Sequence, residues 1–141
     1  LAEMLTKLSP IEVSEAKNGD KLRPGVCYIA PGDYHMTITS DGVIRLNQEE
    51  KVCFVRPSVD VLFNSIAENF RGKVLPIILT GMGEDGAVGS KRFHEKGIDV
   101  FIQDQNSSVV WGMPGAVKRQ VPTSKVVELK DVGQLIELNC L

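Results

Sequence analysis

Two adjacent carboxylates, Glu84 and Asp85, lie inside the glycine-rich segment Gly81-Met-Gly-Glu-Asp-Gly86. Glycines permit a tight turn of the backbone, and such a turn can hold an acidic side chain in a fixed direction. A carboxylate held in this way can orient a histidine ring and stabilise its protonated form. Main-chain amides that are freed at the turn can also point at an oxyanion, so Met82 and its neighbours are candidates for that role.

Two other interpretations of this segment stay open at the level of the residues. It matches the G-x-G-x-x-G pattern of dinucleotide-binding turns, and Asp104 follows at about the spacing expected for a ribose-binding acid. Against this, two carboxylates would repel a pyrophosphate by roughly 4 kcal/mol for each charge pair about 4 Å apart, at an effective dielectric of about 20. In the second interpretation the turn is structural and its two acids cap the helix that follows.

The remaining polar residues give weaker signals. His35 is a candidate general base, although a lone histidine at the start of a strand more often has a structural role. His94 is expected in the middle of a helix and facing solvent, and Ser58 is expected to cap a helix. These residues do not make a complete Ser-His-Asp set, and no ligand cluster indicates a metal, so we expect no cofactor and no metal ion.

The elements on either side of the glycine-rich segment determine where its side chains lie. The apolar run Leu75-Pro-Ile-Ile-Leu79 predicts a strand buried on both faces, and residues 87–96 predict a helix that ends at Gly97. The turn is therefore expected at the carboxyl end of a strand. Open α/β sheets bind their ligands at that edge.

The second half of the chain alternates strands and helices, which predicts a parallel sheet with right-handed crossovers. We expect strands at 98–102 and 125–129 and a short helix at 113–118. Asp131 is expected to cap a last helix. The side chains that this helix is expected to bury are Val132, Leu135, Ile136 and Leu138.

The first half of the chain is richer in β structure. A helix is expected at 2–8, strands at 11–15 and 26–30, and a hairpin at 35–39 and 43–46 whose Asp41-Gly42 sequence favours a two-residue turn. A further helix is expected from Ser58 to about Phe70. Its buried stripe is predicted to contain Val59, Leu62, Phe63 and Ile66.

The composition is typical of one globular domain that spans residues 1–141. Of the 141 residues 43% are apolar and 24% are charged, and the net charge of −2 gives no electrostatic basis for binding nucleic acid or an anionic membrane. No segment is long and apolar enough to cross a membrane, and the absence of any cysteine pairing motif leads us to expect a cytoplasmic protein. The three cysteines are widely spaced and are expected to be unpaired thiols.

Several separated motifs resemble the catalytic domain of the bacterial chemotaxis protein-glutamate methylesterases of the CheB type. They are found in the same order as in that family and cover nearly the whole chain. The motifs are Pro24-Gly-Val-Cys-Tyr-Ile-Ala-Pro31, Arg56-Pro-Ser-Val-Asp-Val-Leu-Phe63, Ile78-Leu-Thr-Gly-Met-Gly-Glu-Asp-Gly-Ala87 and the stretch from Gln103-Asp104 through Val110-Trp-Gly-Met-Pro114.

The resemblance implies a doubly wound, mainly parallel α/β sheet with helices on both faces and an inserted β-hairpin. It implies a Ser-His-Asp triad that hydrolyses glutamate methyl esters, and deamidates glutamines, on the cytoplasmic domains of chemoreceptors. Asp85 matches the triad acid, Met82 borders the oxyanion site together with Gly81 and Gly83, and Glu84 is left as a solvated neighbour. A receiver domain or a chemotaxis kinase is a further possible partner.

The family's serine and histidine lie in a Gly-x-Ser-Thr-Gly-Gly turn and a Gln-His-Met-Pro segment, and neither motif is found in this sequence. We therefore expect the chain to be the carboxyl-terminal part of a longer catalytic domain, without that domain's first strands and inactive alone. The main alternative is a non-catalytic interaction module of the same fold in chemotaxis signalling. A dinucleotide-binding domain is the weaker alternative.

Overall fold

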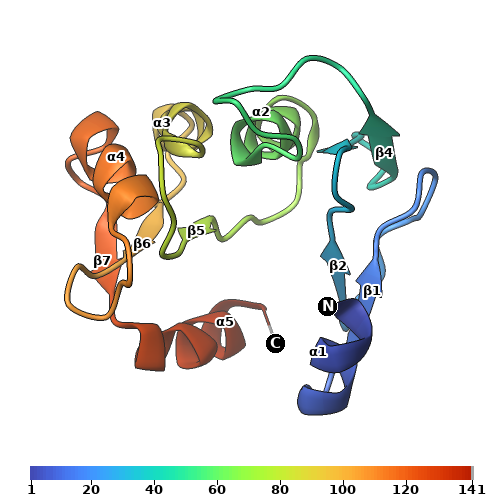
Figure 1. The fold of residues 1–141 in the computed structure, drawn as a ribbon, viewed down its shortest axis with the longest axis horizontal. Coiled ribbons are helices and arrows are strands. Elements are labelled where there is room, and N and C mark those ends of the chain that lie inside the picture. The colour runs from blue at the N-terminus through green and yellow to red at the C-terminus, as the bar shows by residue number, and fades with distance from the viewer. Residues whose placement is uncertain (141) are drawn as a thin grey trace. The chain divides into compact units, whose positions relative to one another are not determined.

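The computed structural model describes residues 1–140, and their backbone forms two compact units, 1–71 and 72–140 (Figure 1). Each unit is described by itself below. The expectation of a single domain over 1–141 stays a prediction, and its last residue lies outside the part that the structure describes.

The first unit contains two pairs of strands and two helices. Its elements are α1 (Ala2–Leu8), β1 (Glu12–Glu15), β2 (Val26–Ile29), β3 (His35–Ile38), β4 (Ile44–Asn47) and α2 (Val59–Asn69). Strands β1 and β2 pair in parallel, whereas β3 and β4 pair antiparallel. Each element lies where the pattern of apolar residues predicts it, within one or two residues at its ends.

The turn of the β3–β4 hairpin is longer than expected. Ile38 pairs with Ile44, and the N–H of Thr39 donates to the carbonyl of Val43 at 3.0 Å, which leaves a three-residue loop. Only Gly42 in this loop has a positive φ, 74°. A two-residue type I′ turn needs positive φ at both central residues, so the expectation of a two-residue Asp-Gly turn is wrong.

Helix α2 begins as predicted, with Ser58 accepting a hydrogen bond from the N–H of Val61 at 3.4 Å. The expected apolar stripe is only partly buried, and the fully buried side chains of α2 are Asp60, Ser65 and Ala67. Ser65 is buried because its hydroxyl accepts from the N–H of Ile38 at 3.0 Å and donates to the carbonyl of Leu62 at 2.8 Å. A polar position of the helix thus satisfies a backbone group of β3.

The core of the first unit lies between the hairpin and helix α2. Its buried members are Ala16, Met36, Ile38 and Ile44. Leu62, Ile66 and Phe70 pack against this cluster from α2 and its carboxyl-terminal end. The helix therefore fixes the hairpin in place through apolar contacts, supplemented by the hydrogen bond from β3 to Ser65.

Helix α1 is joined to strand β1 by one side chain. The hydroxyl of Thr6 donates to the carbonyl of Val13 at 2.8 Å and accepts from the N–H of the same residue at 3.2 Å. Both backbone polar groups of Val13 are satisfied by this single hydroxyl.

The second unit is built on three parallel strands in the order β5 (Ile77–Ile78), β6 (Phe101–Gln103) and β7 (Lys125–Val127). Its helices are α3 (Ala87–Glu95), α4 (Gly112–Gln120), the short 3-10 helix η1 (Leu129–Asp131) and α5 (Val132–Cys140). Helices α4 and α5 lie on opposite sides of the strands in Figure 1. The predicted α/β architecture, with parallel strands covered by helices, is confirmed.

The three strands are shorter than the apolar runs that predict them, because pairing is limited to two residues of β5 and three each of β6 and β7. The expected burial of α5 is largely wrong. Val132 is buried, but Leu138 is 76% exposed and Ile136 is 40% exposed. No helix within residues 1–140 combines the length and the apolar character needed to cross a bilayer.

Candidate active site

The glycine-rich turn connects β5 to α3, as the sequence predicts. Gly86 is the N-cap of α3 with φ of 97°, and Gly83 has φ of 93°. Both values lie in the left-handed region that side chains disfavour, so glycine is required at these two positions. The turn thereby reverses sharply at the carboxyl end of the parallel strands, the edge at which ligands bind in open α/β sheets.

The beginning of the turn is fastened to the segment that precedes α4. The N–H of Gly81 donates to the carbonyl of Val110 at 3.0 Å, and the N–H of Met113 donates to the carbonyl of Gly81 at 2.9 Å. The hydroxyl of Thr80 donates to the carbonyl of Val110 at 3.0 Å and accepts from its N–H at 2.9 Å. Four hydrogen bonds therefore hold Thr80 and Gly81 in place.

These two segments approach so closely that a side chain at position 112 would collide with the backbone of the turn. A Cβ added at Gly112 would lie 2.8 Å from the carbonyl oxygen of Gly81 and 3.0 Å from the nitrogen of Gly83. A Cβ added at Gly81 would lie 2.5 Å from the sulfur of Met113. Because the two segments are packed so densely, any added side-chain volume would displace the backbone of the turn.

A buried amide, Gln103, connects the end of β6 to the turn. Its side chain is fully buried; its Oε1 accepts from the N–H of Thr80 at 2.8 Å, and its Nε2 donates to the carbonyl of Ser107 at 2.7 Å. The indole N–H of Trp111 donates to the carbonyl of Gln103 at 2.8 Å. No pattern of residue types in the sequence indicates a role for Gln103 or Trp111, and the only signal for them is their place in motifs of the family resemblance.

The two carboxylates of the turn lie in different surroundings. Asp85 is 7% exposed, whereas the side chain of Glu84 is 77% exposed and its carboxylate lies 4.0 Å from Nη2 of Arg119. An exposed pair at this distance contributes little to stability, which fits the expectation of Glu84 as a solvated neighbour. A buried carboxylate is held in one orientation by its surroundings, so Asp85 is the better placed of the two to orient another group.

The three residues expected at the oxyanion border differ in what they can offer. The N–H of Gly81 is already bonded to Val110, so Gly81 can contribute only through the shape of the turn. Met82 is 86% exposed and Gly83 is exposed as well. The role of Met82, Gly81 and Gly83 at an oxyanion site stays a prediction, as does the catalytic role of Asp85.

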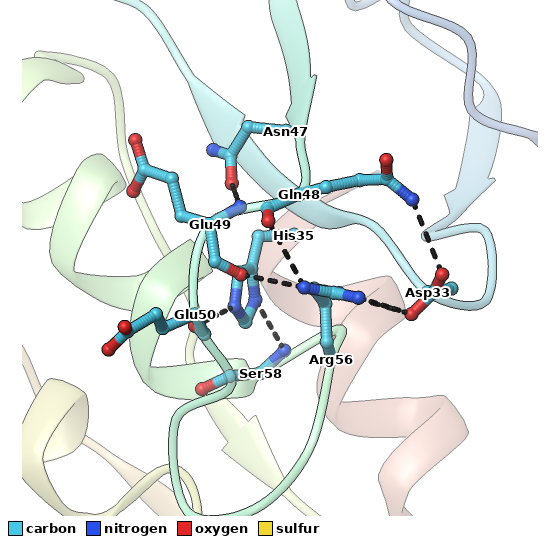
Figure 2. Close-up of polar contacts among 8 residues, drawn as sticks. All are labelled: Asp33, His35, Asn47, Gln48, Glu49, Glu50, Arg56 and Ser58. Atoms are coloured by element: carbon cyan, nitrogen blue, oxygen red, sulfur yellow. Dashed lines mark hydrogen bonds and ion pairs between the residues drawn. The ribbon is translucent and has the colours of Figure 1, made fainter.

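Both nitrogens of His35, in the first unit, are bonded to the main chain, as Figure 2 shows. Nε2 lies 2.8 Å from the carbonyl oxygen of Glu50 and donates to it, while Nδ1 accepts from the N–H of Ser58 at 3.2 Å. The ring is 1% exposed. Because no lone pair is left for a substrate, the structural interpretation of His35 is confirmed and the general-base interpretation is wrong. His94 lies on α3 and is exposed, as expected.

An arginine that the sequence analysis left without a role organises the loop before α2 (Figure 2). Arg56 donates from Nη2 and Nε to Asp33 Oδ1 at 2.6 and 3.1 Å, and from Nη1 to the carbonyls of Gln48 and Glu49 at 3.1 and 3.0 Å. The hydrogen bonds and the charge of this guanidinium lower the pKa of the Asp33 carboxyl below its ordinary value. We refer to residues 47–58 as the Arg56 loop.

Comparison with known proteins places these features in context. The sequence model of the CheB methylesterase family matches residues 1–136. The chain is 45% identical, over 96% of its length, to a protein-glutamate methylesterase/protein-glutamine glutaminase 1 of Rhodospirillum rubrum, and 44% identical, also over 96% of its length, to a protein-glutamate methylesterase/protein-glutamine glutaminase 2 of Caulobacter vibrioides. It spans 36% and 40% of the lengths of these two relatives.

A solved structure agrees with the sequence matches. The crystal structure of the CheB methylesterase catalytic domain of Thermotoga maritima superimposes with a TM-score of 0.89 and 35% sequence identity. The match covers 97% of this chain and 75% of that domain.

Proposed function

The chain belongs to the CheB methylesterase family, and we propose that it forms part of an enzyme that hydrolyses glutamate methyl esters, and deamidates glutamines, on chemoreceptors during chemotaxis adaptation. The observation that carries this proposal is the turn Gly81–Gly86, which is fixed at the carboxyl edge of the sheet and holds Asp85 buried. The curated relatives are named for this activity, and the match runs through the whole turn.

In the proposed reaction a serine attacks the ester carbonyl and a histidine takes the serine's proton. Asp85 orients the histidine and stabilises its protonated form. The serine and the histidine lie in motifs that residues 1–141 do not include, so the working enzyme combines Asp85 with a further part of the catalytic domain. His35 is unsuited to the role because both of its nitrogens are engaged.

The oxyanion of the tetrahedral intermediate needs donors that do not move during the reaction. Main-chain amides around Met82 and Gly83 suit this role, because the turn that carries them is held by Thr80, Gln103 and the glycines. Donors fixed before the reaction need no reorganisation when charge develops on the oxygen.

The substrates of the proposed enzyme are the methylated cytoplasmic domains of chemoreceptors, and a receiver domain or a chemotaxis kinase is a further partner. The enzyme works in the cytoplasm without inserting into the membrane. No nucleic acid is involved, in keeping with the net charge of −2.

Replacing the acid tests the proposal. In a protein that contains these residues together with the serine and histidine segments, Asp85→Asn should lower methanol release from methylated receptor by about 10³–10⁴-fold, because the histidine loses its orienting charge. Its unfolding midpoint should stay close to that of the wild type. Glu84→Gln, one residue away and exposed, is the matched control and should keep its rate. An unchanged rate for Asp85→Asn would remove Asp85 from the mechanism.

A second candidate function is a non-catalytic interaction module of the same fold. The observation in its favour is that neither histidine of this sequence suits a triad, since His35 is engaged and His94 lies on an exposed helix face. A serine-directed phosphonate separates the two candidates, because only a complete active site is labelled. Family membership gives the dinucleotide alternative no support, and the absence of thermal stabilisation by saturating NAD or NADP would dispose of it.

A further inference from the structure

Two main-chain amides of the turn are available to a ligand. The N–H groups of Met82 and Gly83 donate to no acceptor among residues 1–140. Both residues are exposed, so a ligand at the carboxyl edge of the sheet can reach these donors. Such donors stabilise a developing oxyanion only if their direction is fixed before the reaction. The groups that fix this direction therefore contribute to catalysis without contacting the substrate.

The direction of the Met82 amide is set by the residue before it. The carbonyl of Gly81 and the N–H of Met82 belong to one planar trans peptide group and point in opposite directions. The N–H of Met113 donates to this carbonyl at 2.9 Å, and the N–H of Gly81 donates to the carbonyl of Val110 at 3.0 Å. Any movement of Gly81 therefore redirects the amide of Met82.

Gln103 fixes the residue that leads into this peptide group. Its Oε1 accepts from the N–H of Thr80 at 2.8 Å, and its Nε2 donates to the carbonyl and the hydroxyl of Ser107 at 2.7 and 3.2 Å. The side chain is fully buried with both ends bonded, so rotation of its amide would break all three bonds. Its own carbonyl accepts from the indole of Trp111, the residue that pairs with Gly81. Gln103 thus bonds to both segments that meet at Gly81.

We propose that Gln103 is a positioning residue of the enzyme: by fixing Thr80 and Gly81, it aims the unbonded amides of the turn at the oxyanion of the tetrahedral intermediate. This inference rests on the proposed function. Because the side chain is fully buried, Gln103 acts through the turn and not by contact with the substrate. A neutral amide suits this task, since it accepts from Thr80 without placing a negative charge near the one that develops on the substrate.

The test uses the longer enzyme that contains the serine and histidine segments, with the rate of methanol release expressed per folded molecule. Gln103→Leu should lower kcat about 10–100-fold and leave KM within about twofold, because misdirected donors weaken only the transition state. Val121→Ala is the matched control. Val121 is buried at the carboxyl-terminal end of α4 and is bonded to neither the turn nor Gln103, so this variant loses stability through a cavity but should keep its kcat.

Gln103→Glu adds a rescue that depends on pH. A neutral carboxylic acid can accept from the N–H of Thr80 and donate to the carbonyl of Ser107, as the amide does, whereas a carboxylate cannot donate. Burial raises the pKa of such a carboxyl above its ordinary value. The ratio of the kcat of Gln103→Glu to that of the wild type should therefore rise towards one as the pH is lowered from about 9 to about 6.

The outcomes separate a positioning role from a structural one. A Gln103→Leu enzyme whose kcat stays within about twofold of the wild type would overturn the positioning role, and so would a raised KM at constant kcat. A kcat ratio of Gln103→Glu that stays low at every pH would overturn it too. A ratio near one throughout would be the same rescue, by a glutamate that stays neutral.

A wild-type enzyme that binds methylated receptor but releases no methanol would contradict the proposed function instead. The positioning is then read from nitrogen-15 relaxation of the same proteins. The order parameters of the Met82 and Gly83 amides should fall in Gln103→Leu and not in Val121→Ala. Equal order parameters in the wild type and both variants would overturn the inference.

Discussion

Two loops of this chain each lead into a helix, but they are fixed by different means. The Arg56 loop, before α2, is held by charged and polar side chains: Arg56 bonds to a carboxylate and two carbonyls, and His35 bonds at both nitrogens. The turn Gly81–Gly86, before α3, is held by main-chain bonds, a buried neutral amide and close contacts between glycines.

The difference lies in whether charged or neutral groups hold the backbone. The guanidinium of Arg56 and both ring nitrogens of His35 are bonded to the Arg56 loop or to Asp33, so these two residues are structural although their residue types suggest chemistry. In the turn the groups that hold Thr80 and Gly81 are neutral: main-chain amides and carbonyls, the Thr80 hydroxyl and the side-chain amide of Gln103. The following predictions test this comparison in order of decreasing effect on stability.

Removal of the buried amide should have the largest effect. Gln103→Leu keeps the side-chain volume but leaves the N–H of Thr80 and the carbonyl of Ser107 without this partner, which should lower the free energy of unfolding by about 2–4 kcal/mol. Gln105→Leu, exposed in the same loop, should change it by less than about 0.5 kcal/mol. Urea unfolding followed by circular dichroism measures both. Equal midpoints for the two variants would show that neutral bonding does not fix the turn.

The second largest loss of stability is expected when Gly112, which packs against the backbone of the turn, is replaced. Gly112→Ala places a Cβ against the backbone of Gly81 and Gly83 and should lower the free energy of unfolding by about 1–3 kcal/mol. Gly133→Ala is the matched control, because a Cβ at that position of α5 meets nothing within 4 Å; it should be neutral or stabilising by up to about 1 kcal/mol. If both alanines behaved alike in thermal unfolding, the contact at Gly112 would be unimportant.

The third prediction concerns His35, the histidine of β3 that is bonded to the Arg56 loop. His35→Gln disrupts the bonds to Glu50 and Ser58 and should lower the free energy of unfolding by about 1–2 kcal/mol. The methanol-release rate of the longer enzyme, expressed per folded molecule, should stay within twofold of the wild type. A rate loss of a hundredfold or more at unchanged folding would instead mark His35 as a catalytic residue.

The smallest effect should be a pH dependence at Asp33. Arg56 lowers the pKa of this carboxyl in the folded chain, so the unfolded chain takes up the proton at a higher pH. The stabilisation by the pair is therefore complete above the unfolded pKa of about 4 and declines as the pH falls through the lowered folded value.

Asp33→Asn isolates this contribution, because asparagine tolerates the positive φ of 66° at this position. The urea midpoint of the variant should lie slightly below that of the wild type at pH 7, and the difference between the two midpoints should be smaller at pH 3. The same difference at both pH values would mean that the carboxylate charge is irrelevant to the loop.

The sequence predicts the elements of this fold better than the bonds between them. Alternation of apolar residues places β1, β3 and β4 correctly, and Gly97 ends α3 with φ of 78° as expected. These features depend on neighbouring residues, so a local pattern reveals them. The position of the turn and of its buried acid follows in the same way from one strand and one glycine cluster.

Hydrogen bonds from polar side chains to backbone groups far away in the sequence cannot be predicted from a local pattern of residue types. Ser65 bonds to Ile38, 27 residues away, and Gln103 bonds to Thr80, 23 residues away. A hydroxyl or amide that satisfies a main-chain group leaves no periodic signal, and its burial contradicts the rule that places polar residues outside. The apolar stripe expected on α2 is incomplete because the polar Ser65 is buried by such a bond. No pattern in the sequence indicates the role of Gln103.

The hydroxyl of Thr6 has a consequence for association between molecules. An unpaired strand edge is a template on which another chain can add a strand and start aggregation. At Val13 both the donor and the acceptor of β1 are already bonded to Thr6. A strand from another molecule can therefore pair with β1 at Val13 only after it displaces the Thr6 hydroxyl. The side chain of Thr6 thus opposes the addition of a strand at this position of the edge.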